Sequence, residues 1–428
     1  MALRERLFAL EQFGIKLGLD NITRLLDARG RPDRAWKSVH IAGTNGKGSV
    51  TAMVERGLRA AGHRTGRYTS PHLSHIEERI AIDGVPIDAA TFDAATADVL
   101  ATVDALRADG TLEVTPTFFE VTTAVAFEIF RRANVGVGVI EVGLGGRFDA
   151  TNVITPSVTA ITSIALDHER HLGTTLAQIA FEKAGVIKRG VPVVVGAVPG
   201  EAMTVIRDVA ATQGAPLVHA GPEQVASMTL RNGRGTVTIE TPEHRYPSVD
   251  LALAGAHQVG NATVAVRTLE VCRARGIQNE ASDVLTALTD VAWPARIEFV
   301  RMDDNKEVIL DAAHNPDGAA ALAEFLRSAG LAPLPLVVAV MKDKDVQGMV
   351  RALVPVASLV VATQADSARA LPAAELKAVV QSVSSVAVDT FVDPYAAVMR
   401  ALDGVPRAVV AGSIFLVGPL RERLLPRP

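Results

Sequence analysis

Residues 39–50, with the sequence V-H-I-A-G-T-N-G-K-G-S-V, constrain the fold more than any other part of the chain. An apolar, strand-like run enters a loop of three glycines and a lysine, and a helical pattern follows at once. Glycine lets backbone N–H groups approach phosphate oxygens, and the N-terminus of a helix favours an anion. We therefore predict that this loop holds the triphosphate of a nucleotide, with Lys47 reaching the β- and γ-phosphates.

The spacing of this loop differs from that of the ordinary P-loop. The pattern G-x-x-x-x-G-K-[ST] needs glycine where the chain has Ile41 and a hydroxyl where it has Gly48. A glycine–lysine pair in an isolated loop is usually only a turn. The preceding strand and the following helix favour phosphate binding over a turn.

Apolar strand-like runs alternate with helical patterns along almost the whole chain, which indicates parallel sheets covered by helices. We expect strands at 135–142, 158–165, 191–195, 308–312, 336–340 and 359–363, helices at 119–132, 176–187, 262–275 and 319–329, and a small hairpin at 228–241.

The length of 428 residues exceeds the roughly 250–300 residues of a single core, so we expect two domains. A helical pattern ends near residues 291–296, where Pro294 blocks its continuation. The expected domains are residues 1–292 and 297–428.

Composition excludes several classes of function. A formal charge of −4 gives no electrostatic footprint for nucleic acid or an anionic membrane. The one cysteine, Cys272, cannot form an intrachain disulfide, which suits a reducing compartment. The N-terminus lacks the apolar core of a signal peptide, and no apolar run approaches the roughly 18 residues of a membrane span. We expect a soluble, cytoplasmic protein.

Polar side chains stand at the ends of several predicted strands, where open α/β sheets bind ligands. Glu141 ends one apolar strand and is either in a salt bridge or bound to a metal ion. His168 follows another strand, and a single histidine is more often a hydrogen-bonded structural residue than a Mg²⁺ ligand. Ser70 lies in what can be a simple turn, and His257 or Asn261 can cap the helix that follows them.

The motifs in order are G-T-N-G-K-G-S, T-S-P-H-L, E-V-G-L-G-G-R-F-D-A-T-N, L-D-H, E-K-A-G, H-Q-V-G-N-A, W-P-A-R and D-A-A-H-N-P, and they span residues 43 to 316. Their shared order resembles the bifunctional dihydrofolate synthase/folylpolyglutamate synthase family of the Mur ligase superfamily. This resemblance implies an α/β fold, with a Mur-ligase-like P-loop ATPase domain built on a mainly parallel sheet and a smaller Rossmann-like C-terminal domain.

The resemblance also implies a role for individual residues, carried over position by position. ATP would be held by Gly43, Thr44, Asn45, Gly46, Lys47, Gly48, Ser49, Asn261, Arg296 and Asp311, Mg²⁺ by Ser70, Glu141 and His168, and the pterin-bearing substrate by Thr117, Phe118, Phe119, Glu120, Phe148, Asp149 and Ala150. Residues 15–20 resemble the N-terminal part of that pocket, and M-K-D-K-D at 341–345 resembles a family motif of unclear duty.

The reaction implied is two-step amide formation, in which a substrate carboxylate takes the γ-phosphate of ATP and L-glutamate then attacks the acyl phosphate. Lys47, Lys183 and His314 are the catalytic candidates. Lys183 matches a lysine that the family often carries as a carbamate, which would allow a second Mg²⁺ site; unmodified Lys183 paired with Glu182 or Asp167 is the alternative. A monovalent cation is a further candidate, and the enzyme is expected to be a monomer.

Three other functions stay open. Within the family, the chain can be a folylpolyglutamate synthase alone. A Mur-type ligase for a UDP-linked precursor would place a UDP-binding domain before the loop, and only 42 residues precede Gly43. A nucleotide-dependent switch protein would not need polar groups at strand ends in both domains.

Overall fold

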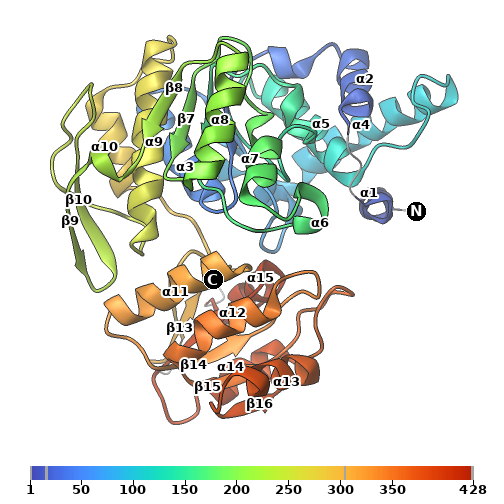
Figure 1. The fold of residues 1–428 in the computed structure, drawn as a ribbon. Helices are drawn as coiled ribbons and strands as arrows, with labels where there is room; N and C mark the ends of the chain where they lie inside the picture. Colours follow the sequence, from blue (N-terminus) through green and yellow to red (C-terminus); the bar gives the residue numbers. More distant parts are fainter. Residues whose placement is uncertain (1, 15–17, 303–304, 426–428) are drawn as a thin grey trace.

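The computed structural model describes residues 2–14, 18–302 and 305–425. It contains two α/β bodies, one below the other in Figure 1. Ile15, Lys16 and Leu17, which belong to the N-terminal part of the expected substrate pocket, lie outside the described residues. No helix within the described ranges has the length and apolar character needed to cross a membrane.

The first body is built on an eight-stranded sheet with the order β4-β3-β2-β5-β1-β6-β7-β8. All neighbours from β2 to β8 pair in parallel, and β3 and β4 add an antiparallel edge. The strands are β1 (Lys37–Ala42), β2 (Thr65–Tyr68), β3 (Ile80–Ile82), β4 (Val85–Pro86), β5 (Val137–Glu141), β6 (Val158–Ile161), β7 (Val193–Gly196) and β8 (Leu217–Ala220). The expected mainly parallel sheet is confirmed.

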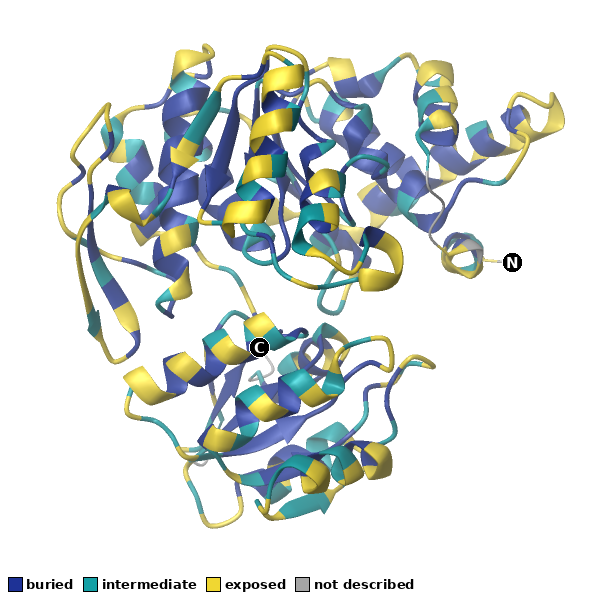
Figure 2. Cartoon of the chain, in the orientation of Figure 1, coloured by how far each residue is buried: buried dark blue, intermediate teal, exposed yellow. Residues whose placement is uncertain are grey.

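Helices cover both faces of this sheet. Alternate residues of β5 separate the two faces, since Val139 packs with α3 and α9 whereas Ile140 packs with α5. The strands between the helices are buried (Figure 2). The helices are α1 (Leu3–Ala9), α2 (Asp20–Ala28), α3 (Lys47–Ala60), α4 (Ala89–Ala108), α5 (Phe118–Arg132), α6 (Glu169–Leu172), α7 (Leu176–Ala184), α8 (Gly200–Thr212), α9 (His257–Ala274) and α10 (Ala281–Thr289).

A separate three-stranded sheet extends from this body beside α9 and α10. It consists of β9 (Val225–Arg231), β10 (Arg234–Ile239) and β11 (Val249–Asp250), with antiparallel pairing throughout. Asn232, with φ 51°, and Gly233, with φ 73°, form its tight turn. The hairpin predicted from the sequence is confirmed.

The second body has a six-stranded sheet with the order β12-β13-β17-β14-β15-β16. Only the β12–β13 pair is antiparallel. Its elements are β12 (Glu298–Arg301), β13 (Glu307–Leu310), α11 (Pro316–Ser328), β14 (Leu334–Val338), α12 (Val346–Leu353), β15 (Ala357–Ala362), α13 (Ala373–Val383), β16 (Val388–Thr390), α14 (Pro394–Ala401), β17 (Arg407–Ala411) and α15 (Ile414–Leu424). Helices α11, α12 and α13 pack on one face and α14 and α15 on the other.

Most element bounds differ from the sequence-based expectation by one to three residues, and two differ by more. Strand β6 ends at Ile161 instead of reaching 165, because the residues after it bond to the glycine-rich loop. Helix α9 begins at His257 instead of 262, so His257 and Asn261 lie inside it. Its N-cap is Ala256, which makes no side-chain cap, and the expectation that His257 or Asn261 caps the helix is therefore wrong.

Candidate functional site

The glycine-rich loop joins the carboxyl end of β1 to the N-terminus of α3. Gly43 and Gly46 have φ of 145° and 84°, in the region that favours glycine. A Cβ on Gly46 would collide with the Asn261 side chain, and one on Gly43 with Thr162. The first α-helical bond of α3 runs from Val50 N to Gly46 O at 2.9 Å. The N–H groups of the residues between them therefore have no acceptor inside the helix, as a phosphate-binding turn requires.

The neighbouring strand β6 fixes the first half of the loop. Thr44 N donates to Ser163 O at 2.8 Å, and Asn45 N donates to Ser163 Oγ at 2.9 Å. Thr162 Oγ1 donates in turn to Asn45 O at 2.6 Å. These bonds use the residues that would otherwise have extended β6, and they make the loop rigid without occupying the start of α3.

Two lysines bind carbonyl oxygens of the loop. Lys47 Nζ donates to Thr44 O at 3.1 Å, and Lys183 Nζ, which is buried, donates to Gly43 O at 2.9 Å. Burial and the nearby charge of Lys47 lower the pKa of Lys183 to about 7. The expected ion pair of Lys183 with Glu182 or Asp167 is wrong for the described residues, since Glu182 pairs with Arg147 and Asp167 with Lys344, each at 2.6 Å.

Glu141 ends β5, directly beside Ile41 of β1. Its carboxylate is buried and receives one hydrogen bond among the described residues, from Ser70 N at 3.3 Å. Burial raises the pKa of this carboxyl group, while the charges of Lys47 and Arg296 oppose the rise. The salt bridge that was one expectation for Glu141 is absent from the described part of the chain, so the carboxylate keeps oxygen lone pairs for a hard cation.

His168 has a different set of partners. Its Nε2 lies 3.2 Å from Lys344 Nζ, and Lys344 also donates to Asp167 Oδ1 at 2.6 Å. Burial and the charge of Lys344 lower the pKa of His168 to about 4, so the ring is neutral at physiological pH. In the described ranges no three His, Cys, Asp or Glu side chains form a metal cluster. A metal at this edge would therefore need the Ser70 hydroxyl, water or phosphate to complete its coordination.

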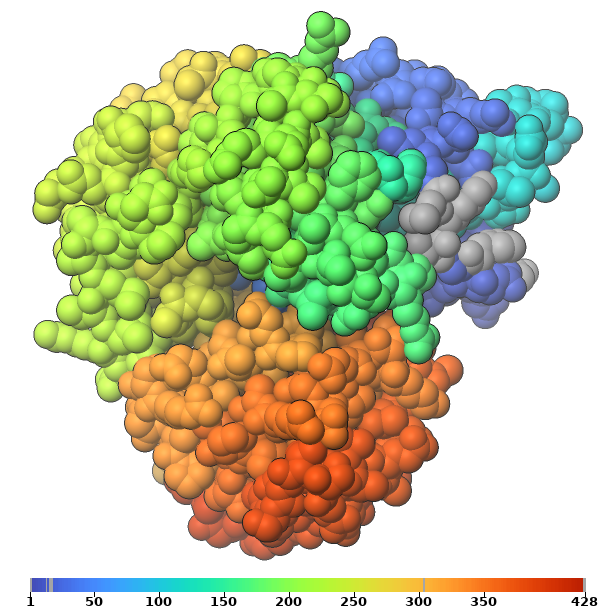
Figure 3. Space-filling model, viewed as in Figure 1, coloured from blue at the N-terminus to red at the C-terminus, as the bar shows by residue number. Residues whose placement is uncertain are grey.

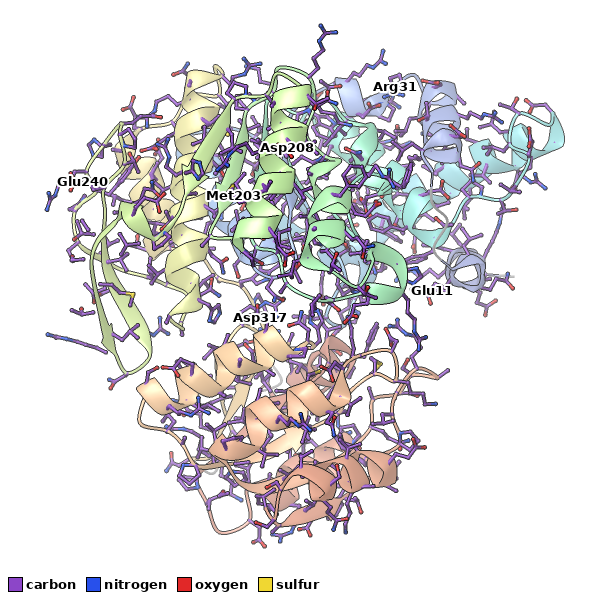
Figure 4. All side chains as sticks on the ribbon, viewed as in Figure 1. Glu11, Arg31, Met203, Asp208, Glu240 and Asp317 are labelled. Atoms are coloured by element: carbon purple, nitrogen blue, oxygen red, sulfur yellow. The ribbon has the colours of Figure 1, made fainter. Side chains whose placement is uncertain are left out.

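The second domain contacts the glycine-rich loop through the N-terminus of α11. Asn315 Nδ2 donates to Asn45 Oδ1 at 3.0 Å and to Asp167 Oδ2 at 3.2 Å. Asp317, at the boundary between the two bodies in Figure 4, accepts a bond from Asn45 Nδ2 at 2.7 Å. The space-filling view shows the second body in contact with the first along this boundary (Figure 3).

Asp311, which is buried, and His314, which is half-buried, lie just before Asn315. Asp311 accepts bonds from Ile297 N at 2.9 Å and Ala313 N at 2.8 Å, and His314 Nδ1 lies 2.9 Å from Ala312 O. Burial raises the pKa of Asp311 and the charge of Arg296 opposes it. The charge of the same guanidinium also opposes the rise in the pKa of Glu141.

Comparisons with known proteins agree with this two-body arrangement. Residues 41–269 match the Mur ligase middle domain and residues 295–416 the Mur ligase glutamate ligase domain. A Bacillus subtilis protein named dihydrofolate synthase/folylpolyglutamate synthase is 34% identical over 419 residues, which cover 96% of each chain. The chain belongs to this family of Mur ligases.

Two solved structures of the family cover nearly the whole chain. The structure of Mycobacterium tuberculosis folylpolyglutamate synthase complexed with ADP matches with a TM-score of 0.91 and 34% identity, covering 100% of this chain and 99% of that one. The structure of Escherichia coli FolC in complex with DHPP and ADP matches with a TM-score of 0.86 and 26% identity, covering 98% and 97%.

The residues expected to hold the substrate of this Mur ligase fall into two groups. Thr117 and Glu120 form a capping box at the start of α5, in which Thr117 N donates to Glu120 Oε2 at 2.7 Å. Their side chains are thus engaged in holding the helix. Phe119 faces Tyr68, with ring centroids 6.1 Å apart, and a Cβ on Gly143 would lie 2.5 Å from its ring.

Phe148, Asp149 and Ala150 lie at the glycine loop after β5, and Phe118 is the first residue of α5. Asp149 Oδ2 accepts from Leu144 N at 2.8 Å, and Ala150 follows it into a buried 3₁₀ turn. Phe148 lies under the Arg147 guanidinium, 4.4 Å from the ring centroid, and Phe118 under Arg79 at 5.1 Å. The structure therefore brings Phe119 and Asp149 together at Gly143.

Asn261 and Ser49 are connected through a third side chain. Asn261 Nδ2 donates to Gln258 Oε1 at 2.9 Å, and Gln258 Nε2 donates to Ser49 Oγ at 3.3 Å. The sequence motif H-Q-V-G-N-A thus becomes one turn of α9 that packs on the start of α3.

Sequence reasoning gave no role to Lys344 or Asp317 and did not name Arg67. The Arg67 guanidinium lies 4.9 Å from the ring centroid of Trp293, which also contacts Gly48. The M-K-D-K-D motif was the one available signal for Lys344, since polar residues after a parallel strand lie at the ligand edge.

Proposed function

We propose that this chain is an ATP-dependent ligase that joins L-glutamate to dihydropteroate and to the γ-carboxylate of reduced folates. The observation that carries the proposal is the contact of α11 with the glycine-rich loop, through Asn315, Asp317 and Asn45. A ligase of this kind needs such a contact, because nucleotide, acceptor and amino acid must meet at one place. Membership of the family supports the reaction class.

The proposed nucleotide site is the glycine-rich loop with three residues from outside it. The N–H groups at the start of α3 and the Lys47 ammonium would bind the phosphates. Asn261 lies against Gly46, Arg296 lies in the segment between the two domains, and Asp311 comes from the second domain, directly after β13. The buried position of Asp311 suits a hydrogen bond to a sugar hydroxyl or base.

Glu141, Ser70 and His168 are the proposed Mg²⁺ ligands. Glu141 fits this role best, since it is a buried carboxylate with a single hydrogen bond among the described residues. When bound, Mg²⁺ would neutralise charge on the transferring phosphoryl group. His168 fits only if its Nε2 leaves Lys344.

In the proposed reaction, the acceptor carboxylate attacks the γ-phosphorus of ATP, the bond to the β-phosphate oxygen breaks, and ADP leaves. The amino group of L-glutamate then attacks the acyl carbon, loses a proton and expels phosphate. Lys47 would stabilise negative charge on the phosphoryl oxygens. His314 is neutral because burial and the charge of Lys344 lower its pKa to about 4, and its proposed role is to orient glutamate without carrying a charge.

Lys183 is proposed to act as a carbamate. Because its pKa is about 7, the neutral amine that attacks CO₂ is populated near pH 7, and the carbamate would remove a positive charge next to Lys47. A carbamate would also offer oxygen ligands to a second Mg²⁺, and a monovalent cation remains a candidate for the same edge.

Three further properties belong to this proposal. The domains are residues 1–292, for ATP and pteroate, and 297–428, for ATP and glutamate. The active unit is a monomer, because one chain supplies both sides of the site. The enzyme acts in the cytoplasm, in keeping with its lone, buried Cys272.

The test is ADP release by the purified chain with Mg²⁺, ATP and L-glutamate, to which dihydropteroate or tetrahydrofolate is added. Acceleration by both acceptors, lost without L-glutamate and in Lys47→Met, is the expected result. Acceleration by tetrahydrofolate alone would leave polyglutamylation only. If neither acceptor accelerates ADP release, the folate assignment is wrong.

A further inference from the structure

Lys344 extends from the segment between β14 and α12 across to the first domain. Its Nζ donates to Asp167 Oδ1 at 2.6 Å and lies 3.2 Å from His168 Nε2. Only 8% of the side chain is exposed, although Lys342, two residues earlier, is exposed. The function proposed above gives Lys344 no role.

The contact with His168 has one chemically sensible direction. An ammonium group has donors and no acceptor, so His168 Nε2 must present its lone pair to Lys344. A histidine binds a metal ion through this same lone pair of a neutral ring. Lys344 and a metal ion therefore cannot both bind Nε2 of His168.

Asp167 keeps the rest of the cluster in place. It accepts from Asn315 Nδ2 at 3.2 Å, and His314 Nε2 lies 3.8 Å from its Oδ2. The backbone N–H of His168 also donates to Asp167 Oδ1 at 2.8 Å. Without the Lys344 ammonium, the Asp167 carboxylate would still accept hydrogen bonds from His168 N of the first domain and Asn315 Nδ2 of the second. The contacts around Asp167 therefore do not depend on Lys344 alone.

We propose that Lys344 is a positioning residue, an internal cation that occupies Nε2 of His168 while no metal is bound and yields this atom to the metal ion. The inference rests on the metal role proposed for His168. Because binding linkage is reciprocal, a residue that competes with the metal weakens metal binding, and the metal weakens its contact with His168. The second domain therefore responds to metal loading through one side chain.

The experiment measures binding of Mn²⁺ alone to the full chain without nucleotide, by electron paramagnetic resonance of the free ion. Lys344→Met keeps an apolar stem of similar length and removes the charge. We expect its Kd for Mn²⁺ to be about fivefold lower than that of the wild type, or lower still. The matched control Lys342→Met removes an exposed charge two residues away and should leave Kd unchanged.

A double variant identifies the atom concerned. In a His168→Ala background, Lys344→Met should no longer tighten Mn²⁺ binding. Equal or weaker Mn²⁺ binding by Lys344→Met in the wild-type background overturns the proposal, as does a gain that persists without His168. If Lys344→Met does not fold, as judged by circular dichroism, Lys344→Leu, which also has no hydrogen-bond donor, takes its place with the same expectation.

This result is independent of the proposed reaction. If the wild type shows no glutamate-dependent ADP release, the ligase assignment is refuted, but the comparison of Mn²⁺ affinities still holds. Normal ligase activity with unchanged Mn²⁺ affinity in Lys344→Met would refute the competition and leave the ligase assignment intact.

Discussion

Asn315 donates its side-chain amide to Asn45 Oδ1 at 3.0 Å and caps α11 with its own Oδ1, which accepts from Gly318 N at 2.8 Å. One side chain therefore caps the N-terminus of α11 in the second domain and also binds the glycine-rich loop of the first domain. The cap of α11 and the contact between the two domains therefore depend on the same residue.

The change Asn315→Asp separates these two tasks. Aspartate caps a helix as well as asparagine does, but it cannot donate to Asn45 or Asp167. We expect glutamate-dependent turnover to fall roughly tenfold, since a lost buried hydrogen bond is worth about 1–3 kcal/mol, and thermal stability to fall as well, because the new carboxylate lies beside Asp167. Steady-state kinetics and calorimetry check both. Unchanged kcat would mean that the contact plays no part in turnover.

The pKa of Lys183, about 7, predicts how activation by CO₂ depends on pH. Only the neutral amine attacks CO₂, and its fraction rises from roughly 10% at pH 6 to roughly 90% at pH 8. At a fixed concentration of dissolved CO₂, a CO₂-depleted sample should regain activity faster at pH 8 than at pH 6. A carbamate resonance from ¹³CO₂ in nuclear magnetic resonance spectra should appear in parallel and be missing in Lys183→Met.

Thr117 and Phe119 should respond differently to truncation. Thr117→Ala removes the N-cap of α5 and should lower the free energy of unfolding by about 1 kcal/mol, with Thr117→Ser as the neutral control. Phe119→Leu leaves the cap intact and should raise KM for the pterin acceptor without changing KM for ATP. Chemical denaturation measures the change in the free energy of unfolding, and kinetics with each substrate measure the change in KM. The prediction is contradicted if Thr117→Ala and Phe119→Leu change these two quantities alike.

His40 should make stability depend on pH. It is fully buried in β1, which lowers its pKa to about 3, and Nε2 lies 2.8 Å from Thr151 Oγ1. Since the unfolded chain protonates near pH 6.5 and the folded chain does not, the stability due to neutral His40 is full above pH 6.5 and is lost as pH falls. Between pH 7.5 and 5 the loss is about 2 kcal/mol.

Denaturant unfolding at the two pH values measures this loss. His40→Gln keeps a side-chain nitrogen for Thr151 but does not titrate, so its unfolding free energy should change less between pH 7.5 and 5. His72, His168, His257 and His314 also have lowered pKa values and add to the slope in both proteins. An equal slope in wild type and His40→Gln would contradict the prediction.

The sequence predicted what depends on local pattern. The strand before Gly43 and the helix after it follow from periodicity, and Glu141 at a strand end was placed correctly because parallel strands share one edge. Even the capping box of Thr117 and Glu120 was readable as T-x-x-E before an apolar run, although the resemblance assigned both residues to the substrate.

Contacts between distant parts of the chain could not be predicted in this way. Asn45 and Asn315 are 270 positions apart, and no periodicity relates them. The contact of Lys344 with Asp167 depends on how the second domain packs against the first, which the local sequence does not determine. The same holds for Asn261, whose side chain lies against Gly46 of the nucleotide loop, a contact that no local pattern shows.

The contact of Trp293 with Gly48 explains why this loop is not an ordinary P-loop. A Cβ at position 48 would lie 2.9 Å from the indole ring, so the serine or threonine of the usual motif has no room there. The hydroxyl instead stands one residue later, on Ser49. The segment that carries Trp293 and the nucleotide loop therefore fit each other sterically, and a standard Walker sequence grafted here would displace the tryptophan.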